Sequence, residues 1–226
     1  MNSALLLSGG TGSRIESSVP KQYLRVGDKM IITRSLLTLL QHPMVDAVWI
    51  VVYEEWQDVI MDEIPVELVG KLRGFVEPGE TRSGSIVNGL NAMRGAMSDT
   101  DVVLIHDAAR PNVSAETVSA CLDACREHDG AMPVLLMKDT VYESVDGKLV
   151  TRLLEREHIY AGQAPEAFLY GKYMAAYERL SDAEIAALHG STEPAIMAGM
   201  DIAMISGDEG NYKITTSADM KRLMGK

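Results

Sequence analysis

The sequence contains no long apolar run and no sign of an export signal. No apolar stretch approaches the roughly 18 residues that would suggest a membrane span. The first residues, Met1-Asn2-Ser3, lack the charged region of a signal peptide. We therefore expect a cytoplasmic protein with no membrane partner.

Basic residues and metal-binding residues are also scarce. The chain has 21 lysines and arginines against 32 acidic residues, and its formal net charge is −11. This argues against a nucleic-acid partner, because such a partner calls for a basic face. None of the five histidines forms an H-x-x-x-H pair. No cysteine or histidine is spaced to complete a zinc site with Cys121 and Cys125, so we expect buried thiols.

What is present is a regular alternation of apolar segments and helical patterns. A chain of 226 residues with 46% hydrophobic content can bury one sizeable core, which predicts a single domain over residues 1–226. Strands are expected at 4–7, 48–52, 74–76, 102–105 and 132–137, and helices at 33–41, 56–63, 82–97 and 114–128. This β-α-β order predicts an α/β fold: a Rossmann-like, doubly wound, mostly parallel sheet with helices on both faces.

The alternation stops after Met137. Residues 140–145 and 148–153, joined by Asp146-Gly147, predict a hairpin with a two-residue turn. We expect it to form an arm, over about residues 139–157, that projects from the domain. An isolated hairpin is marginal in water, so its apolar side chains predict a homodimer. Beyond the arm, we expect a strand at 202–205, an extended piece at 213–216 and a helix at 217–223.

The most informative segment is the opening turn, Ser8-Gly9-Gly10-Thr11-Gly12-Ser13-Arg14, which follows the first strand. Glycines let backbone N–H groups approach an anion closely. Arg14 and Lys21 add two cations, and the combination predicts a polyphosphate site. Ile15 breaks the dinucleotide fingerprint, and no Gly-Lys-Ser/Thr of a Walker A loop occurs. The alternative is an ordinary glycine-rich turn with two exposed cations.

Polar residues follow other predicted strands as well. Ligands of open α/β sheets bind at the carboxyl ends of the strands. We therefore expect residues 79–85, 106–111, 139–140 and Lys213 to converge on one site. Asp107 is the candidate magnesium ligand, because Mg²⁺ is usually held by one or two carboxylates together with water and substrate phosphate. The alternative for Asp107 is a helix cap or a loop carboxylate.

Several motifs stand in an order that resembles a known family. They are residues 9–14 (GGTGSR), 20–24 (PKQYL), 82–89 (RSGSIVNG), 106–111 (HDAARP), 139–140 (DT), 162–168 (GQAPEAF) and 213–216 (KITT). Over its whole length the chain resembles the cytidylyltransferases that make CDP-polyols from CTP. Two branches are similar to it: methylerythritol-phosphate cytidylyltransferase of isoprenoid biosynthesis and ribitol-5-phosphate cytidylyltransferase of teichoic-acid or capsule synthesis.

The resemblance implies a role for each motif, with CTP and a polyol phosphate as substrates and Mg²⁺ or another divalent cation as cofactor. The implied catalytic residues are Arg14, Lys21 and Lys213, and the implied metal ligand is Asp107. The implied nucleotide-binding residues are Ser8, Gly9, Gly10, Thr11, Gly12, Gly79, Arg82, Ser85 and Ala108. The implied acceptor-binding residues are Arg110, Asp139, Thr140 and Arg156, and the partner subunit would supply Thr140 and Arg156 through the arm.

The chain departs from the family pattern on the acceptor side. Ala164 and Glu166 stand where the family usually has Thr and Gln, and its Thr-Asp motif is missing. Ungapped counting from Lys213 puts His189-Gly190 at that place. Trp56 and residues 160–163 and 180–184 favour ribitol 5-phosphate as the acceptor, whereas residues 106–110 favour the methylerythritol branch.

Ribitol 5-phosphate is the slightly favoured acceptor, with 2-C-methyl-D-erythritol 4-phosphate as the alternative. The more distant alternatives are a nucleotide-sugar glycosyltransferase and an inactive nucleotide-binding module. Asp99-Thr100-Asp101 resembles the D-x-D of such glycosyltransferases, but it precedes its strand and is expected to be a solvated turn.

Overall fold

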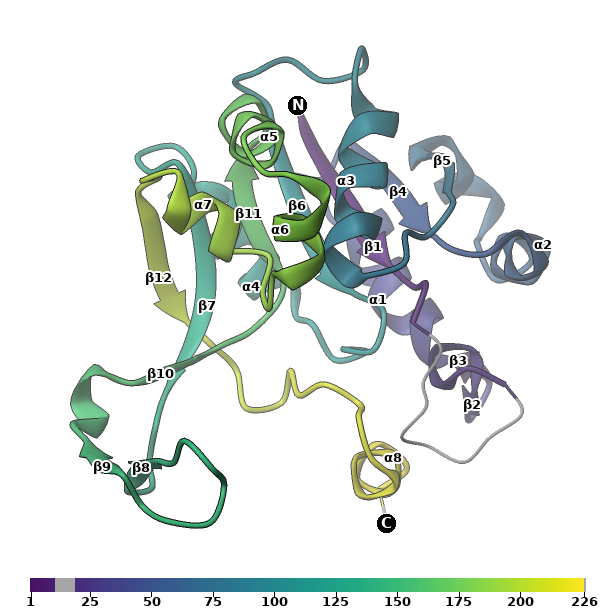
Figure 1. The fold of residues 1–226 in the computed structure, drawn as a ribbon. Coiled ribbons are helices and arrows are strands. Elements are labelled where there is room, and N and C mark those ends of the chain that lie inside the picture. Colours follow the sequence, from purple (N-terminus) through teal and green to yellow (C-terminus); the bar gives the residue numbers. More distant parts are fainter. Residues whose placement is uncertain (11–18, 226) are drawn as a thin grey trace.

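A computed structural model of the chain describes residues 1–10 and 19–225. Thr11, Gly12 and Arg14 of the predicted phosphate loop therefore lie outside the described residues. The main sheet has the order β10-β7-β11-β6-β1-β4-β5 (Figure 1). Strands β10 and β11 pair with one edge of β7, and β12 pairs with its opposite edge. Its strands are β1 (Asn2–Leu7), β4 (Ala47–Val51), β5 (Leu72–Val76), β6 (Val102–Asp107), β7 (Gly130–Leu136), β10 (Tyr160–Gly162), β11 (Glu166–Leu169) and β12 (Ile202–Ser206).

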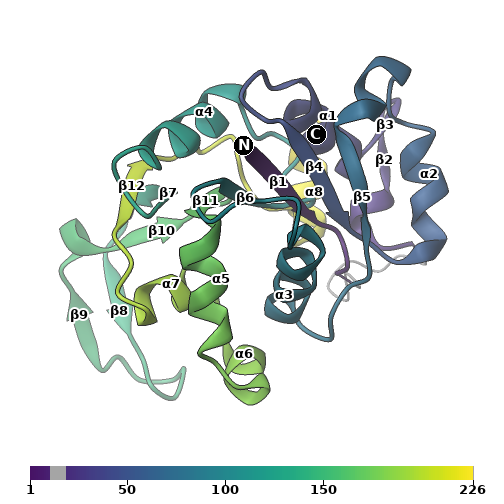
Figure 2. The same cartoon turned by 90° about the horizontal axis from the view of Figure 1, so that it is seen from above.

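Helices cover both faces of this sheet, as the β-α-β order predicts. Figure 2 shows α1 (Ile31–Gln41) and α4 (Ala115–Ala124) on one face, and α3 (Arg82–Met93) and α5 (Tyr170–Glu178) on the other. Strand β1 is buried on both sides. Ala4 and Leu6 pack with α1 and α4, whereas Leu5 and Leu7 pack with α3 and α5. A continuous apolar run is what a strand covered on both faces requires.

The parallel part of the sheet is β5-β4-β1-β6, and it confirms the α/β prediction. The remaining elements are β2 (Arg25–Val26), β3 (Lys29–Met30), α2 (Gln57–Met61), α6 (Asp182–Ala187), α7 (Glu193–Met197), α8 (Ser217–Leu223) and 3₁₀ turns at Lys21–Tyr23, Glu54–Trp56, Val66–Lys71 and Arg156–His158. Within the described residues, no helix is both long and apolar enough to span a membrane.

Strand β11 is the largest departure from the predicted sheet. It runs antiparallel between β6 and β7, and it pairs with both. Residues 162–168 show neither an alternating pattern nor a long apolar run, so the sequence did not predict a strand there. The insertion carries Glu166 into the centre of the sheet, directly opposite Ile105 of β6.

Helices α3 and α4 end earlier than expected. Helix α3 stops at Met93, not at residue 97, and Gly95 then adopts a φ of 92°. Only glycine takes such a conformation without strain, so the helix cannot continue through it. Residues 213–216, which were expected to be an extended piece, pair with no strand. The N–H of Ile214 instead donates to the carbonyl of Ala109 at 2.8 Å, which fixes Lys213 beside the end of β6.

The predicted arm exists, but its turn is longer than expected. Strands β8 (Val141–Glu143) and β9 (Arg152–Leu154) pair with each other and project from the body of the molecule (Figure 1). The prediction of a two-residue turn at Asp146-Gly147 is wrong, because β8 ends at Glu143 and β9 begins at Arg152. The Asp146 carboxylate accepts from the backbone N–H groups of residues 148 and 149, and these bonds stabilise a wider loop.

Candidate active site

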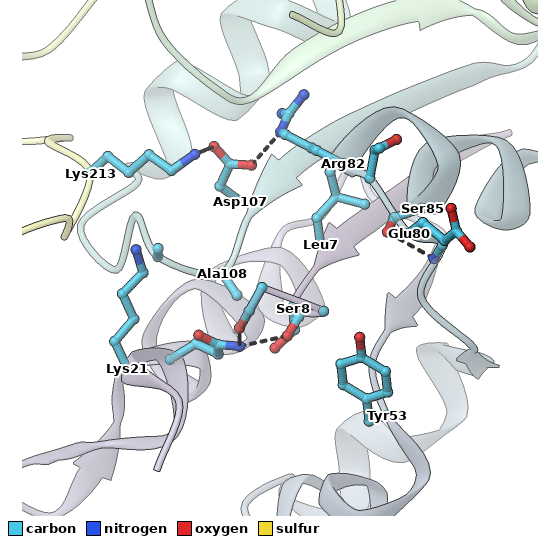
Figure 3. A pocket seen from close by; sticks show the side chains of 16 residues that line it. Leu7, Ser8, Lys21, Tyr53, Glu80, Arg82, Ser85, Asp107, Ala108 and Lys213 are labelled. Atoms are coloured by element: carbon cyan, nitrogen blue, oxygen red, sulfur yellow. Dashed lines mark hydrogen bonds and ion pairs between the residues drawn. The ribbon is translucent and has the colours of Figure 1, made fainter. Parts of the chain in front are cut away.

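One cleft gathers the ends of β1, β5 and β6, as the strand-end argument predicts. Its volume is about 340 Å³, a size that suits a small-molecule ligand (Figure 3). It is lined by Leu7, Ser8, Gly9, Gly10, Lys21, Gln22, Tyr53, Gly79, Glu80, Thr81, Arg82, Ser85, Asp107, Ala108, Ala109 and Lys213. Ten residues that the sequence assigned to catalysis, nucleotide or metal are among them: Ser8, Gly9, Gly10, Lys21, Gly79, Arg82, Ser85, Asp107, Ala108 and Lys213.

The start of the glycine loop is held against the segment that carries Lys21. The amide of Gln22 donates to the carbonyls of Ser8 and Gly10, at 2.7 Å each. The hydroxyl of Tyr23 donates to the Ser8 carbonyl at 3.0 Å, and its ring stacks on Trp56 with centroids 4.1 Å apart. Through these contacts Gln22 and Tyr23 hold the segment of Lys21 against Ser8 and Gly10, and Lys21 therefore lines the same cleft.

Glycine is required at two positions of the cleft, because the backbone of Gly84 approaches Gly79 and the side chain of Pro78 approaches Gly9. A Cβ on Gly79 would lie 2.6 Å from the carbonyl carbon of Gly84, and one on Gly9 would lie 2.5 Å from Pro78. The Gly79 N–H donates to the Ser85 hydroxyl at 3.1 Å, and Thr81 caps α3 by accepting from the Gly84 N–H at 3.0 Å. The N-terminus of α3, which favours negative charge, therefore borders the cleft.

Asp107 lies among cations at the end of β6. Its Oδ1 accepts from Nε of Arg82 at 3.0 Å, and its Oδ2 accepts from Nζ of Lys213 at 2.9 Å (Figure 3). Burial raises the pKa of this carboxyl, but Arg82 and Lys213 outweigh burial and hold its pKa well below the ordinary range. Asp107 is therefore ionised across the physiological range, and it organises the two cations around itself.

Two neighbours of Asp107 support the turn and do not line the cleft. Arg110 donates from Nη1 to the carbonyl of Asn211 at 2.8 Å, and this bond ties the end of β6 to the segment before Lys213. The Nε2 of His106 lies 3.2 Å from the Arg110 carbonyl. Burial lowers the pKa of His106 to about 4, so at neutral pH this ring is uncharged and its Nε2–H donates to that carbonyl.

The other residues predicted to bind the acceptor are distant from this cleft. Asp139, Thr140 and Arg156 are exposed on or beside the arm, and none of them lines the cleft. Arg156 donates from Nη1 to the carbonyl of Lys138 at 2.9 Å, a contact within its own arm.

Sequence reasoning missed a buried cluster behind the cleft. Glu166 accepts from the hydroxyls of Ser191 and Thr192, and Arg82 donates from Nη1 to the Ser191 hydroxyl at 3.0 Å. Counting without gaps had placed His189-Gly190 at this position, but His189 is exposed. The only warning in the sequence was Glu166 itself, a carboxylate inside an otherwise apolar stretch.

Asp107 fits a magnesium ion that is held mainly by the substrate. Among the described residues, no group of three or more His, Cys, Asp or Glu side chains could hold a metal alone. Magnesium commonly keeps several waters and takes one or two carboxylates plus phosphate oxygens. Each oxygen of Asp107 has one close donor and about one further lone-pair site. The donor set therefore suits Mg²⁺ once a polyphosphate lies in the cleft.

A doubly wound sheet that brings glycines, lysines and a carboxylate around one cleft at its strand ends is the arrangement expected of a nucleotidyltransferase. The family model for IspD, 2-C-methyl-D-erythritol 4-phosphate cytidylyltransferase, matches residues 3–223. The chain belongs to this family, and the predicted cytidylyltransferase resemblance is confirmed.

Individual relatives match nearly the whole length of the chain. A 2-C-methyl-D-erythritol 4-phosphate cytidylyltransferase of Geobacter metallireducens is 37% identical, over 96% of this chain and 93% of its own. A ribitol-5-phosphate cytidylyltransferase of Streptococcus pneumoniae is 29% identical, over 96% of this chain and 94% of its own. The solved 4-diphosphocytidyl-2C-methyl-D-erythritol synthase of Anaerococcus prevotii superposes with a TM-score of 0.81 at 24% identity, over 99% and 94% of the two chains.

Proposed function

We propose that this enzyme transfers the cytidylyl group of CTP to 2-C-methyl-D-erythritol 4-phosphate, giving a CDP-polyol and pyrophosphate. The cleft that brings Lys21, Asp107 and Lys213 to the glycine loop is the observation that carries the reaction class. The acceptor is proposed from the relatives. Sequence identity to the methylerythritol-phosphate enzyme is 37%, against 29% for the ribitol-phosphate enzyme. This favours the alternative of the sequence analysis over ribitol 5-phosphate.

The reaction needs positioning and charge more than a base. The second pKa of a phosphate monoester is about 6, so the acceptor phosphate is mostly dianionic at neutral pH and is already a nucleophile. One of its oxygens attacks the α-phosphorus of CTP. The bond from that phosphorus to the bridging oxygen of the β-phosphate breaks, and pyrophosphate leaves with the electron pair. No proton has to be removed, which suits a cleft whose histidine neighbour is buried and neutral.

Within this proposal, different residues of the cleft bind the phosphates, the nucleoside and Mg²⁺. Backbone N–H groups at Gly9 and Gly10 face the phosphates, and Lys21 and Lys213 neutralise charge that grows on the α-phosphate. Residues 79–85 and Ala108 surround the nucleoside. Asp107 would hold Mg²⁺, which would neutralise phosphate charge when bound. Arg14 and residues 11–12 are assigned to the same phosphates on the resemblance alone.

The acceptor is tested by measuring pyrophosphate release with CTP and a panel of polyol phosphates. We expect the highest kcat/KM with 2-C-methyl-D-erythritol 4-phosphate. A higher value with ribitol 5-phosphate would return the assignment to that branch. The absence of pyrophosphate release with every polyol phosphate would contradict the proposed function.

CTP is the expected nucleotide. Cytosine differs from uracil in its exocyclic amine, and a site that hydrogen-bonds such a group discriminates strongly against an analogue that lacks it. The backbone and side-chain oxygens of residues 79–85 are the candidate acceptors. We expect kcat/KM for UTP to be lower by about 100-fold or more. Steady-state kinetics with CTP, UTP and ATP at saturating acceptor measure this, and comparable values would contradict the assignment.

Replacing Asp107 by asparagine is expected to raise the Mg²⁺ concentration at half-maximal activity by about tenfold, because a neutral amide replaces the charged ligand. Titration of activity with Mg²⁺ measures this midpoint. Glu80→Gln is the matched comparison, because Glu80 is the other carboxylate at the cleft, and its midpoint should not move. An unchanged midpoint for Asp107→Asn would remove Asp107 from the metal site.

We also propose a homodimer whose arms exchange. The arm exposes apolar side chains that a single chain leaves uncovered: Val145 is 86% exposed and Leu149 72% exposed, and Tyr142, Val150 and Leu153 are exposed as well. Packing of the arm on a second copy would bury these side chains. It would also bring Thr140 and Arg156 to the partner's acceptor, which accounts for their distance from the cleft of their own chain.

A further inference from the structure

A buried carboxylate with no assigned part in the reaction lies behind the cleft. Glu166 stands on β11 and is 8% exposed. Thr192 donates from Oγ1 to its Oε1 at 2.9 Å, and the hydroxyl of Ser191 donates to its Oε2. Both hydroxyls belong to the loop that enters α7, and the Tyr173 hydroxyl holds that loop by donating to the Ser191 carbonyl at 2.8 Å. Glu166 therefore fixes this loop to the centre of the sheet.

The same cluster fixes the guanidinium of Arg82 from three sides. Nε donates to Asp107 Oδ1 and Nη1 donates to the Ser191 hydroxyl, at 3.0 Å each, and Nη2 lies 3.9 Å from Glu166 Oε2. A planar guanidinium that is hydrogen-bonded at two nitrogens and has a carboxylate beside the third is restricted in its orientation. Since Arg82 contacts one oxygen of Asp107 and Lys213 contacts the other, the orientation of Arg82 also determines that of Asp107.

The charge of Glu166 in this arrangement depends on pH. Arg82 lies between two carboxylates, Asp107 and Glu166, and the ionised form of Glu166 is its counter-charge from behind. Burial raises the pKa of Glu166 to about 7, although Arg82 opposes this rise. A charge buried in this way is costly without partners, and here both carboxylate oxygens accept hydrogen bonds.

We propose that Glu166 is a positioning residue for the transfer: through Ser191 it orients Arg82, and through Arg82 it orients the Asp107 carboxylate, which would hold Mg²⁺ beside the reacting phosphates. The inference rests on the proposed function, because it requires Asp107 to act in the cleft. Figure 3 shows the Arg82 guanidinium, Asp107 and Lys213 at the end of the cleft away from Tyr53 and Ser85. Glu166 therefore supports the end of the cleft at which Asp107 and Lys213 lie.

The structure also joins two departures from the family pattern. A glutamate replaces the usual glutamine at position 166, and Thr192 stands in the segment where the Thr-Asp motif is missing. These two side chains are hydrogen-bonded to each other. A carboxylate on one side of this contact and its donor on the other have the same complementarity in either order. The two segments that depart from the family pattern are therefore in direct contact.

The first test is Glu166→Gln, with Glu178→Gln as the control. Glu178 is an exposed partner of Arg94 on α5, so the control makes the same charge change at the surface. We expect Glu166→Gln to lower kcat/KM for the polyol phosphate by about tenfold, the lower end of what loss of a supporting partner causes. The Kd for CTP, measured by calorimetry, should change less than threefold. A loss of fold alone would lower the active fraction and leave both KM values unchanged.

The second test restores the carboxylate from the opposite side. Thr192→Asp alone places two carboxylates in contact and should also lower kcat/KM for the acceptor. In the double variant Glu166→Gln, Thr192→Asp, the carboxylate stands at position 192 and an amide donor stands at position 166. We expect the double variant to be more active than either single variant, a non-additivity that shows direct coupling. Additive losses would contradict the coupling.

Ser191→Ala gives a test that introduces no buried charge change and keeps the proposal falsifiable if Glu166→Gln does not fold. It removes the hydroxyl between Arg82 and Glu166, and kcat/KM for the acceptor should fall by about tenfold or more, as for loss of one hydrogen bond to a charged group. Wild-type activity in both Glu166→Gln and Ser191→Ala would overturn this inference alone. A wild-type protein that releases no pyrophosphate would overturn the proposed function with it.

Discussion

Lys21→Ala is expected to lower kcat by about 100- to 1,000-fold, the usual cost of one interaction made mainly in the transition state. Negative charge grows on the α-phosphate as the acceptor oxygen attacks it, and Lys21 faces the cleft where this happens. The Kd for CTP should rise much less, because the ground-state triphosphate keeps the glycine loop, Lys213 and the end of α3. Single-turnover kinetics and calorimetry separate the two effects.

Lys221→Ala is the control for Lys21→Ala. Lys221 is an exposed lysine of α8, outside the cleft, and its replacement makes the same change in net charge. Normal kcat for Lys21→Ala would show that the lysine has no part in the transition state. A large rise in the Kd for CTP with unchanged kcat would assign Lys21 to binding of the substrate only.

A mixture of two inactive variants, Lys21→Ala and Arg156→Ala, is expected to regain about a quarter of wild-type activity if subunits exchange at random in a two-fold dimer. Each active site would take Lys21 from one chain and Arg156 from the arm of the other. Half of the dimers would then be mixed, and each mixed dimer would have one intact site. Activity after co-refolding, measured together with the sedimentation coefficient, gives the result.

Lys21→Ala mixed with Lys213→Ala is the matched control for complementation. Both lysines line the cleft of the same chain, so a mixed dimer would have two damaged sites and no activity should return. A monomeric protein would contradict the shared-site proposal. A Lys21→Ala and Arg156→Ala mixture as inactive as its parents would contradict it too.

The sequence alone determined the parts of this protein that depend on local pattern. The apolar run at the start of the chain required a strand covered on both faces, and β1 is such a strand. Gly9 and Gly79 follow predicted strands and could be assigned to a cleft for that reason, and a Cβ at either position would collide with a neighbouring residue. Asp107 and Lys213 were predicted to converge on one site at the carboxyl ends of the strands. Lys213 Nζ lies 2.9 Å from Asp107 Oδ2.

The tertiary structure alone decided what depends on contacts between distant segments. An antiparallel β11 between β6 and β7 has no local signature, since its pairing partners are far away in the sequence. Without it, Glu166 could not be placed beside Ser191 and Thr192, and counting residues gave the wrong neighbours. The turn of the arm was mispredicted for a related reason: strand pairing at Glu143 and Arg152, and not the Asp-Gly pair, sets its length. Local pattern fixes which residues are buried and where the backbone can bend, but side-chain partners follow from the packing of whole elements.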